Sequence, residues 1–152
     1  SFFVENLCKI NSIPFYSKDF DINIPKHSVQ MAARKLRYDW FYELLELHKY
    51  DFILTAHHLN DSIETFFINL SRSTGIDGLT GIKSINNKVV RPLLPFNKSQ
   101  IIDYANDNNI KWREDSSNLK DNYLRNKIRN KLVPVFIDID SNFLWIIRKH
   151  SI

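Results

Sequence analysis

The sequence has one cysteine, one methionine and only three glycines among its 152 residues. The single cysteine, Cys8, excludes a disulfide framework and a cluster of thiolate metal ligands. All three glycines lie between Gly75 and Gly81, which leaves no glycine-rich phosphate-binding loop. No apolar run approaches the ~18 residues that a membrane-spanning helix needs, and no signal peptide is found. We therefore expect a cytoplasmic protein with no membrane contact.

The residues that are abundant are those of an ordinary globular domain, with 43% hydrophobic and 25% charged. The formal net charge of +4 equals the surplus of residues 111 to 132, which hold seven Lys or Arg and three Asp or Glu, so the rest of the chain is neutral. A surplus confined to one segment favours contact with a polyanion, although a solvated charged face is the commoner explanation of a basic run.

Hydrophobic periodicity predicts alternating helices and strands in the first half of the chain. The expected order is helix, strand, helix, strand, helix over residues 2–11, 13–20, 29–47, 52–55 and 61–72. This order predicts an α/β fold with a partial Rossmann-like parallel sheet and crossover helices. The chain starts with Ser1 and has no strand pattern before its first helix, so we expect a first strand further upstream. The two longer helices should bury Val29, Ala32, Ala33, Leu36, Trp40, Leu44, Leu47, and Ile63, Phe66, Phe67, Leu70, with Ser28 as the cap of the first.

The second half predicts a mainly helical portion. After Gly81 we expect a hairpin around Asn86-Asn87, a helix at about 99–108, a short extended piece at 110–112 and a loop at 114–118. A helix from Tyr123 should turn Leu124, Ile128 and Leu132 inward and stop at Pro134, and the tail at 140–152 should be helical. The predicted domains are 1–80 as a partial nucleotide-binding α/β domain, 81–137 as the remainder of the same catalytic domain, and 138–152 as a linker helix.

Residues 55 to 65 place two imidazoles and two carboxylates just beyond an apolar run, where a strand should end and a helix begin. Ligands bind at the carboxyl ends of strands in open α/β sheets. If the helix already includes His57, then His57, Asp61 and Glu64 share one face, since each residue advances about 100°. Such a face could hold magnesium or an ammonium group, whereas the pattern is poor for zinc. The alternative is a helix cap, with Asp61 as N-cap and Glu64 three residues later.

Two further groups of cations stand at helical spacing. Arg34 and Arg37 could lie along a helix surface or reach a pyrophosphate. The second group consists of four cations without an intervening acid, namely Arg125, Lys127, Arg129 and Lys131, with Asn126 between the first two. These cations could neutralise a row of phosphates, and a solvated helix surface is the competing explanation.

Six segments in this order resemble the N-terminal PP-loop domain of the tRNA(Ile)-lysidine synthetase family. They are ARKLRY at 33–38, AHHLNDSIET at 56–65, LSRSTGIDGL at 70–79, RPLL at 91–94, EDSSN at 114–118 and RNKIR at 125–129. Each segment alone is a weak signal, but their order from about residue 30 to 135 is specific. Ser73 stands where the family pattern has glycine.

The resemblance implies an adenine nucleotide alpha hydrolase-like fold and a ligase that joins free lysine to the wobble cytidine of an isoleucine tRNA. ATP, with Mg²⁺, adenylates the cytosine and releases pyrophosphate, and the lysine amine then displaces AMP. The implied partners are tRNA(Ile), lysine and ATP, and a homodimer is allowed. The implied catalytic residues are Asp61, Glu64 and His57, which would bind lysine and its proton, and Arg37, which would contact the nucleotide or the reaction intermediate. Arg34 and His57 would also contact the nucleotide, and the implied contacts with tRNA or lysine are Arg125, Arg129, Asn126, Lys127 and Lys131. No metal ligands are assigned.

One departure from the family pattern matters. The SGGxDS loop that wraps the ATP phosphates is absent from this sequence, so we expect the chain alone not to turn over. Three alternatives stay open: another PP-loop tRNA-modifying enzyme such as a thiolase, a non-catalytic tRNA-binding module, and a small metal hydrolase built on His57, His58 and Asp61.

Overall fold

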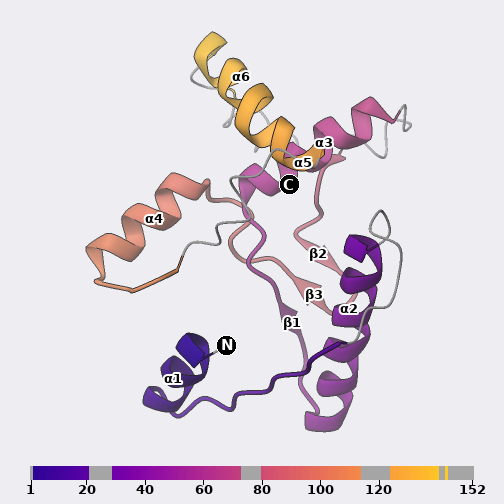
Figure 1. Cartoon of the computed structure of the whole chain (residues 1–152), viewed down its shortest axis with the longest axis vertical. Helices are drawn as coiled ribbons and strands as arrows, with labels where there is room; N and C mark the ends of the chain where they lie inside the picture. The colour runs from indigo at the N-terminus through magenta and orange to yellow at the C-terminus, as the bar shows by residue number, and fades with distance from the viewer. Residues whose placement is uncertain (1, 21–28, 73–79, 114–123, 141–142, 144–152) are drawn as a thin grey trace. The chain divides into compact units, whose positions relative to one another are not determined.

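The computed structural model describes residues 2–20, 29–72, 80–113, 124–140 and 143 (Figure 1). The chain divides into two compact units, Ser1–Tyr50 and Asp51–Ile152, and each is described by itself. The domain boundaries expected at residues 80 and 137 stay predictions. Within the described ranges, no helix combines the length and apolar character that crossing a membrane requires.

The first unit contains two helices, α1 at Phe2–Ile10 and α2 at Val29–His48, and both confirm the periodicity of the sequence. The strand expected at residues 13–20 is wrong, because this segment joins no sheet among the described residues. Its side chains pack on α2 instead: the ring centroids of Tyr16 and His48 are 4.7 Å apart, and Lys18 Nζ lies 2.9 Å from an oxygen of Glu43. The extended segment at 13–20 thus packs on a helix surface and does not pair with a strand of the described sheet.

The buried face of α2 agrees with the prediction except at its C-terminal end. The six predicted positions from Val29 to Leu44 are half-buried, but Leu47 is 74% exposed and Leu45 is 2% exposed. The ring of His48, one turn after Leu45, lies tilted against the ring of Tyr16, so the extended segment covers that side of the helix end. The predicted cap, Ser28, lies outside the described residues.

The second unit is built around a three-stranded sheet in the order β1-β3-β2, seen at the centre of Figure 1. Strand β1 at Ile53–Leu54 pairs in parallel with β3 at Val89–Val90, and β2 at Ile85–Asn86 pairs with β3 in antiparallel orientation. The α/β class is confirmed, and β1 pairs in parallel as expected, but the sheet as a whole is mixed, because the predicted hairpin joins it and its tight turn makes β2 and β3 run in opposite directions. The turn lies one residue later than predicted, with Asn87 at φ 51°.

Helix α3 at Leu59–Ser71 follows β1 and contributes most of the core of this unit. Leu59, Ile63 and Phe67 pack against the last helices of the unit, with Ile63 completely buried. The expected inward position of Leu70 is wrong, since this side chain lies in the last turn, beyond the packed cluster, and is exposed. The helix begins two residues earlier than predicted.

Helix α4 at Lys98–Asp107 confirms the predicted helix with a shift of one residue. Asn97 caps it: its side chain accepts a hydrogen bond from the backbone N–H of Gln100 at 2.9 Å, and the Gln100 side chain accepts one from Asn97 N–H at 3.0 Å. This reciprocal pair is a capping box. The loop predicted at 114–118 lies outside the described residues.

The last helical path consists of α5 at Leu124–Lys127, a π-helical turn η3 at Ile128–Leu132 and α6 at Val133–Ile139 (Figure 1). The prediction that Pro134 stops the helix is wrong. The wide turn, with Val133 N–H donating to Ile128 O, lets Pro134 occupy the first turn of α6, where its missing N–H needs no partner. The turn also shifts the inward positions, so that Ile128 and Val133 are buried while Leu124 and Leu132 are exposed. Of the tail predicted as helical, only Asp140 and Phe143 are described, and Phe143 stacks on Phe136 of α6.

Candidate functional site

The candidate site begins where β1 ends. Thr55 continues the ladder by donating its N–H to Val90 O at 3.0 Å, and its hydroxyl lies 2.9 Å from Nδ1 of His57. Helix α3 starts only at Leu59, so His57 precedes the helix. The expectation that His57, Asp61 and Glu64 share one helix face is therefore wrong for His57. Asp61 and Glu64, three residues apart within the helix, do share a face.

Asp61 is part of the helix cap in a different position from the one predicted. His58 is the N-cap, and its backbone N–H donates to Oδ2 of Asp61 at 3.0 Å. Asp61 is therefore the third residue of the helix and not its cap, which corrects the prediction. Its carboxylate is well placed there, because a helix N-terminus attracts negative charge. The His58 ring approaches the same carboxylate, with Nε2 3.6 Å from Oδ2.

Glu64 is the most unusual residue of the site, since it carries an acid group that is completely buried (0% exposed). Both of its oxygens bind Arg129: Nε donates to Oε1 at 2.6 Å and Nη2 to Oε2 at 3.1 Å. Arg125 adds an ion pair, with Nε 3.0 Å from Oε2. A buried carboxylate is tolerated only when it is paired in this way, because its desolvation is costly.

The two arginines come from the opposite side of the core. Arg125 and Arg129 are one turn apart on α5 and η3, and Ile128 beside them packs on Ile63 of α3. This packing brings both guanidinium groups to Glu64, yet the side chains of Arg125 and Arg129 remain 41% and 31% exposed. The site thus joins a buried anion to two cations that reach the surface.

Arg129 also links the two carboxylates, because its Nη2 lies 3.6 Å from Oδ1 of Asp61. The hydrogen bond with Glu64 raises the pKa of Arg129 above its ordinary value, and the charges of Glu64 and Asp61 act in the same direction, whereas burial opposes them. The guanidinium is therefore a permanent cation.

Neighbouring loops hold the start of α3 in place. Leu59 N–H donates to Phe96 O at 2.9 Å, and the side chain of Asn60 accepts a hydrogen bond from Lys98 N–H at 2.9 Å. These bonds set the first turns of α3 and α4 side by side. On the other side of α3, the buried hydroxyl of Ser62 accepts a hydrogen bond from Ile82 N–H at 3.0 Å.

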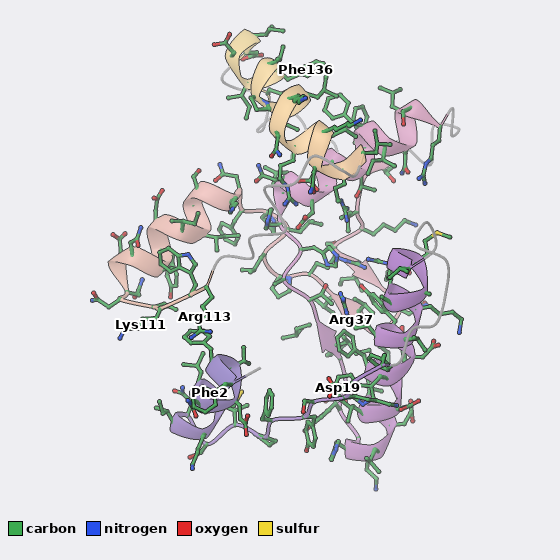
Figure 2. All side chains as sticks on the ribbon, in the orientation of Figure 1. Phe2, Asp19, Arg37, Lys111, Arg113 and Phe136 are labelled. Atoms are coloured by element: carbon green, nitrogen blue, oxygen red, sulfur yellow. The ribbon has the colours of Figure 1, made fainter. Side chains whose placement is uncertain are left out.

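The remaining predicted site residues belong to the first unit or lie on other faces of α5 and η3. Arg34 and Arg37 are exposed on α2 in the first unit, where the Arg34 guanidinium lies over the Tyr38 ring (Figure 2 labels Arg37). The stretch of α5 and η3 from Arg125 to Lys131 is called the basic helix. Its four cations do not form a single row, because Lys127 and Lys131 are exposed whereas the two arginines turn toward Glu64; Asn126 is half-buried.

Two residues of the AHHLNDSIET segment make contacts that the sequence did not predict. His58 contacts Asp61, and its Nδ1 is buried without a hydrogen-bond partner in the described part of the chain. Thr65 accepts a hydrogen bond from Arg125. The signal for His58 was its place immediately before the helix; no local signal marked Thr65.

A metal site is not apparent at these positions. Among the described residues, no three His, Cys, Asp or Glu side chains are grouped so that they could bind a metal ion. Asp61 and Glu64 both face arginine. The described residues therefore do not fit a metal centre, and the alternative of a small metal hydrolase has no support from them.

Comparison with known proteins yields one consistent group. A model of the PP-loop domain matches residues 1–136. The tRNA(Ile)-lysidine synthase of Bacteroides thetaiotaomicron is 42% identical over 142 residues, which are 91% of this chain and 33% of that protein. The enzymes of the same name from Petrotoga mobilis and Chlorobaculum tepidum are 39% and 40% identical over 145 and 137 residues. These alignments cover 93% and 88% of this chain but 47% and 41% of those proteins, so the chain spans less than half of each relative.

Proposed function

The chain belongs to the PP-loop domain family, and from this membership we propose that it is the ATP- and lysine-using part of a tRNA(Ile)-lysidine synthase. The complete enzyme would join lysine to the wobble cytidine of tRNA(Ile). The structural observation that carries the proposal is the cluster at the end of β1, where Asp61 and buried Glu64 meet two arginines of a basic helix. The relatives' names and the order of the sequence segments support the substrate.

The reaction has two steps. ATP first adenylates the oxygen at carbon 2 of the cytosine and releases pyrophosphate, and the lysine amine then displaces AMP. The first step needs cations around the phosphates, because positioning and electrostatics carry most of such a transfer. We assign the nucleotide contacts to Arg37 and Arg34, and to His57, whose Nδ1 lies against Thr55. No described residue is assigned to magnesium.

The second step needs a base. Lysine attacks only as the free amine, and with a reference pKa of ~10.4 that form is roughly one part in two thousand at neutral pH. A carboxylate can bind the ammonium and accept its proton. Asp61 suits this role, because its carboxylate has about four acceptor sites, of which the backbone N–H of His58 uses one, while the His58 ring nitrogen and one nitrogen of Arg129 each lie 3.6 Å away.

Glu64 has a different role in this scheme. Both of its oxygens already accept hydrogen bonds from Arg129, and its burial denies a substrate direct access. We therefore assign proton transfer to Asp61 and the positioning of Arg125 and Arg129 to Glu64. This assignment separates two carboxylates that the sequence pattern treats alike.

RNA contact falls to the basic helix. Arg125 and Arg129 are held in place yet partly exposed, and guanidinium groups bind phosphate in two-pronged fashion. The exposed Lys127 and Lys131, with Asn126, extend the positive surface. The target base must leave its stack to react, so an anticodon-loop nucleotide is a suitable substrate.

The test uses the complete protein with the substitution Asp61→Asn. Lysine-dependent AMP release should fall by about 100-fold or more, whereas tRNA affinity should change by less than about twofold. The residual rate should rise about tenfold per pH unit, because alkaline solution supplies the free amine that the variant no longer generates. The matched control is Asp103→Asn, an exposed acid on α4. A parallel loss of tRNA affinity in Asp61→Asn would contradict the assigned role.

The second candidate is a non-catalytic tRNA-binding module. The outward-facing Lys127 and Lys131 favour it, since they require only a polyanion. Salt-dependent tRNA binding by the complete protein without lysine-dependent AMP release would support this candidate and overturn the ligase. A PP-loop thiolase is disfavoured, because Cys8 is the only cysteine in the chain.

A further inference from the structure

The hydroxyl of Thr65 links the acidic helix to the basic one. It donates to the backbone oxygen of Asp61 one turn earlier at 2.8 Å, and it accepts a hydrogen bond from Nη2 of Arg125 at 3.1 Å. The first bond is common for threonine in helices and needs no functional explanation. The second bond joins residues 60 positions apart in the chain and does need one.

The polarity of this arrangement is fixed. A hydroxyl has one proton, and the proton of Thr65 is used by the Asp61 carbonyl, so only lone pairs face Arg125. A guanidinium group has donors only. The hydroxyl is therefore locked as an acceptor at one position relative to Arg125.

The contact of Arg125 with Glu64 orients the guanidinium less strictly. Its Nε lies 3.0 Å from Oε2 of Glu64, but the N–H is not aligned for a hydrogen bond. Arg129, by contrast, binds the same carboxylate through two hydrogen bonds. Glu64 therefore attracts Arg125 without fixing its plane, and the hydrogen bond to Thr65 supplies the missing constraint.

The constraint also decides which part of Arg125 is presented outward. Nε and Nη2 form one edge of the planar guanidinium, and both are engaged by α3. Nη1 lies on the opposite side, and the side chain is partly exposed. Holding a long, flexible side chain in its binding orientation reduces the entropy that is lost when a ligand binds.

We propose that Thr65 is a positioning residue, which orients Arg125 so that its outer edge meets an RNA phosphate. This inference rests on the proposed function of the basic helix as an RNA-binding element. It assigns no contact with the reacting atoms to Thr65, which acts through Arg125 alone.

The test measures binding of this chain to a tRNA(Ile) anticodon stem-loop with cytidine at the wobble position, by fluorescence anisotropy. Thr65→Val keeps the shape of the side chain but removes the acceptor, and it should weaken binding about 5- to 10-fold. Thr65→Ser keeps the hydroxyl and should restore affinity to within about twofold of wild type. Ser71→Ala is the control, because the hydroxyl of Ser71 donates to the backbone oxygen of Ile68 in the same helix, a contact within α3 and not with the basic helix.

A double-mutant cycle separates positioning from a structural effect. If Thr65 acts through Arg125, adding Thr65→Val to Arg125→Gln should cause no further loss of affinity. Thermal unfolding midpoints of all variants show whether the fold has changed. A further loss in the double variant, or unchanged binding in Thr65→Val, overturns the inference.

The same experiment distinguishes the inference from the proposed function. If the wild-type chain does not bind the RNA in a salt-dependent manner, or if Arg125→Gln binds as tightly as wild type, the RNA contact itself is wrong and the inference falls with it. If Arg125→Gln weakens binding while Thr65→Val does not, only the positioning role of Thr65 is overturned.

Discussion

Replacing Glu64 with glutamine should destabilise the second unit by about 2 kcal/mol. The substitution keeps the size of the side chain but removes the negative charge that faces two guanidinium groups. The glutamine oxygen can still accept one hydrogen bond from Arg129. Its amide nitrogen, however, brings N–H donors toward a second group that has only donors, which is an unfavourable contact.

The magnitude follows from the exposure of the partners. Removing one member of a fully buried ion pair costs about 3–5 kcal/mol, whereas an exposed pair contributes about 0–1 kcal/mol. Glu64 is completely buried, but Arg125 and Arg129 can recover some hydration through their exposed edges. An intermediate value of about 2 kcal/mol corresponds to a fall of about 6 °C in the unfolding midpoint for a chain of this size.

The assay is urea unfolding of the chain followed by circular dichroism, with Asp39→Asn as the matched control. Asp39 pairs with Lys35 four residues earlier on α2, and both side chains are largely exposed. The control should change stability by less than about 0.5 kcal/mol. Arg129→Gln should cost about as much as Glu64→Gln, and the double variant should cost less than the sum of the two. If Glu64→Gln behaves like the control, the buried cluster does not stabilise the fold and the reasoning is refuted.

Three further outcomes are expected. Gly81→Ala should lower the free energy of unfolding by about 2 kcal/mol, because Gly81 has φ 73° and an added Cβ would collide with the buried hydroxyl of Ser62. Adding Ser62→Ala to the same chain should recover part of this loss. An unchanged free energy of unfolding in Gly81→Ala would contradict the prediction. Asn97→Ala should cost about 1 kcal/mol in urea unfolding through loss of the α4 cap, and no loss would contradict the capping box. The difference in the free energy of unfolding between wild type and Arg129→Gln should be constant from about pH 7 to about pH 10. The pKa of Arg129 is raised in the folded state, so the stabilisation by its charge is fully present below the pKa of arginine in the unfolded chain and is lost only as pH rises through the folded-state pKa. A decline within that range would show that another group controls the cluster.

The helices with clear periodicity could be predicted from the sequence, and the errors have physical causes. Residues 13–20 have the composition of a strand, but a strand also needs a partner, and composition does not specify one. The passage of the helix through Pro134 depends on the π-helical turn before it, which the proline rule does not anticipate. The sheet became mixed because a two-residue turn, and not a helix, connects β2 to β3.

The site was predictable in part. The spacing of Asp61 and Glu64 placed them on one face of a helix, and the spacing of Arg125 and Arg129 did the same for the cations. Nothing in either pattern shows that the two faces meet, because that contact depends on the packing of Ile63 against Ile128 across the core. A shared face with His57 required a helix that already includes this residue, whereas α3 starts at Leu59.

Burial is the property that separates the two acids. Asp61 lies at the open end of α3, where it can serve both the cap and a substrate, whereas Glu64, one turn deeper, is enclosed by α3 and the basic helix. An enclosed carboxylate must keep its cations, so the fold requires Arg125 and Arg129 to remain at Glu64 whether or not a ligand is bound. Substitutions at Glu64 or Arg129 should therefore change stability and RNA affinity together, and they cannot by themselves assign a catalytic role. Asp61 and Thr65 are the more informative positions, because both are only half-buried and neither takes part in the two hydrogen bonds that hold buried Glu64 to Arg129.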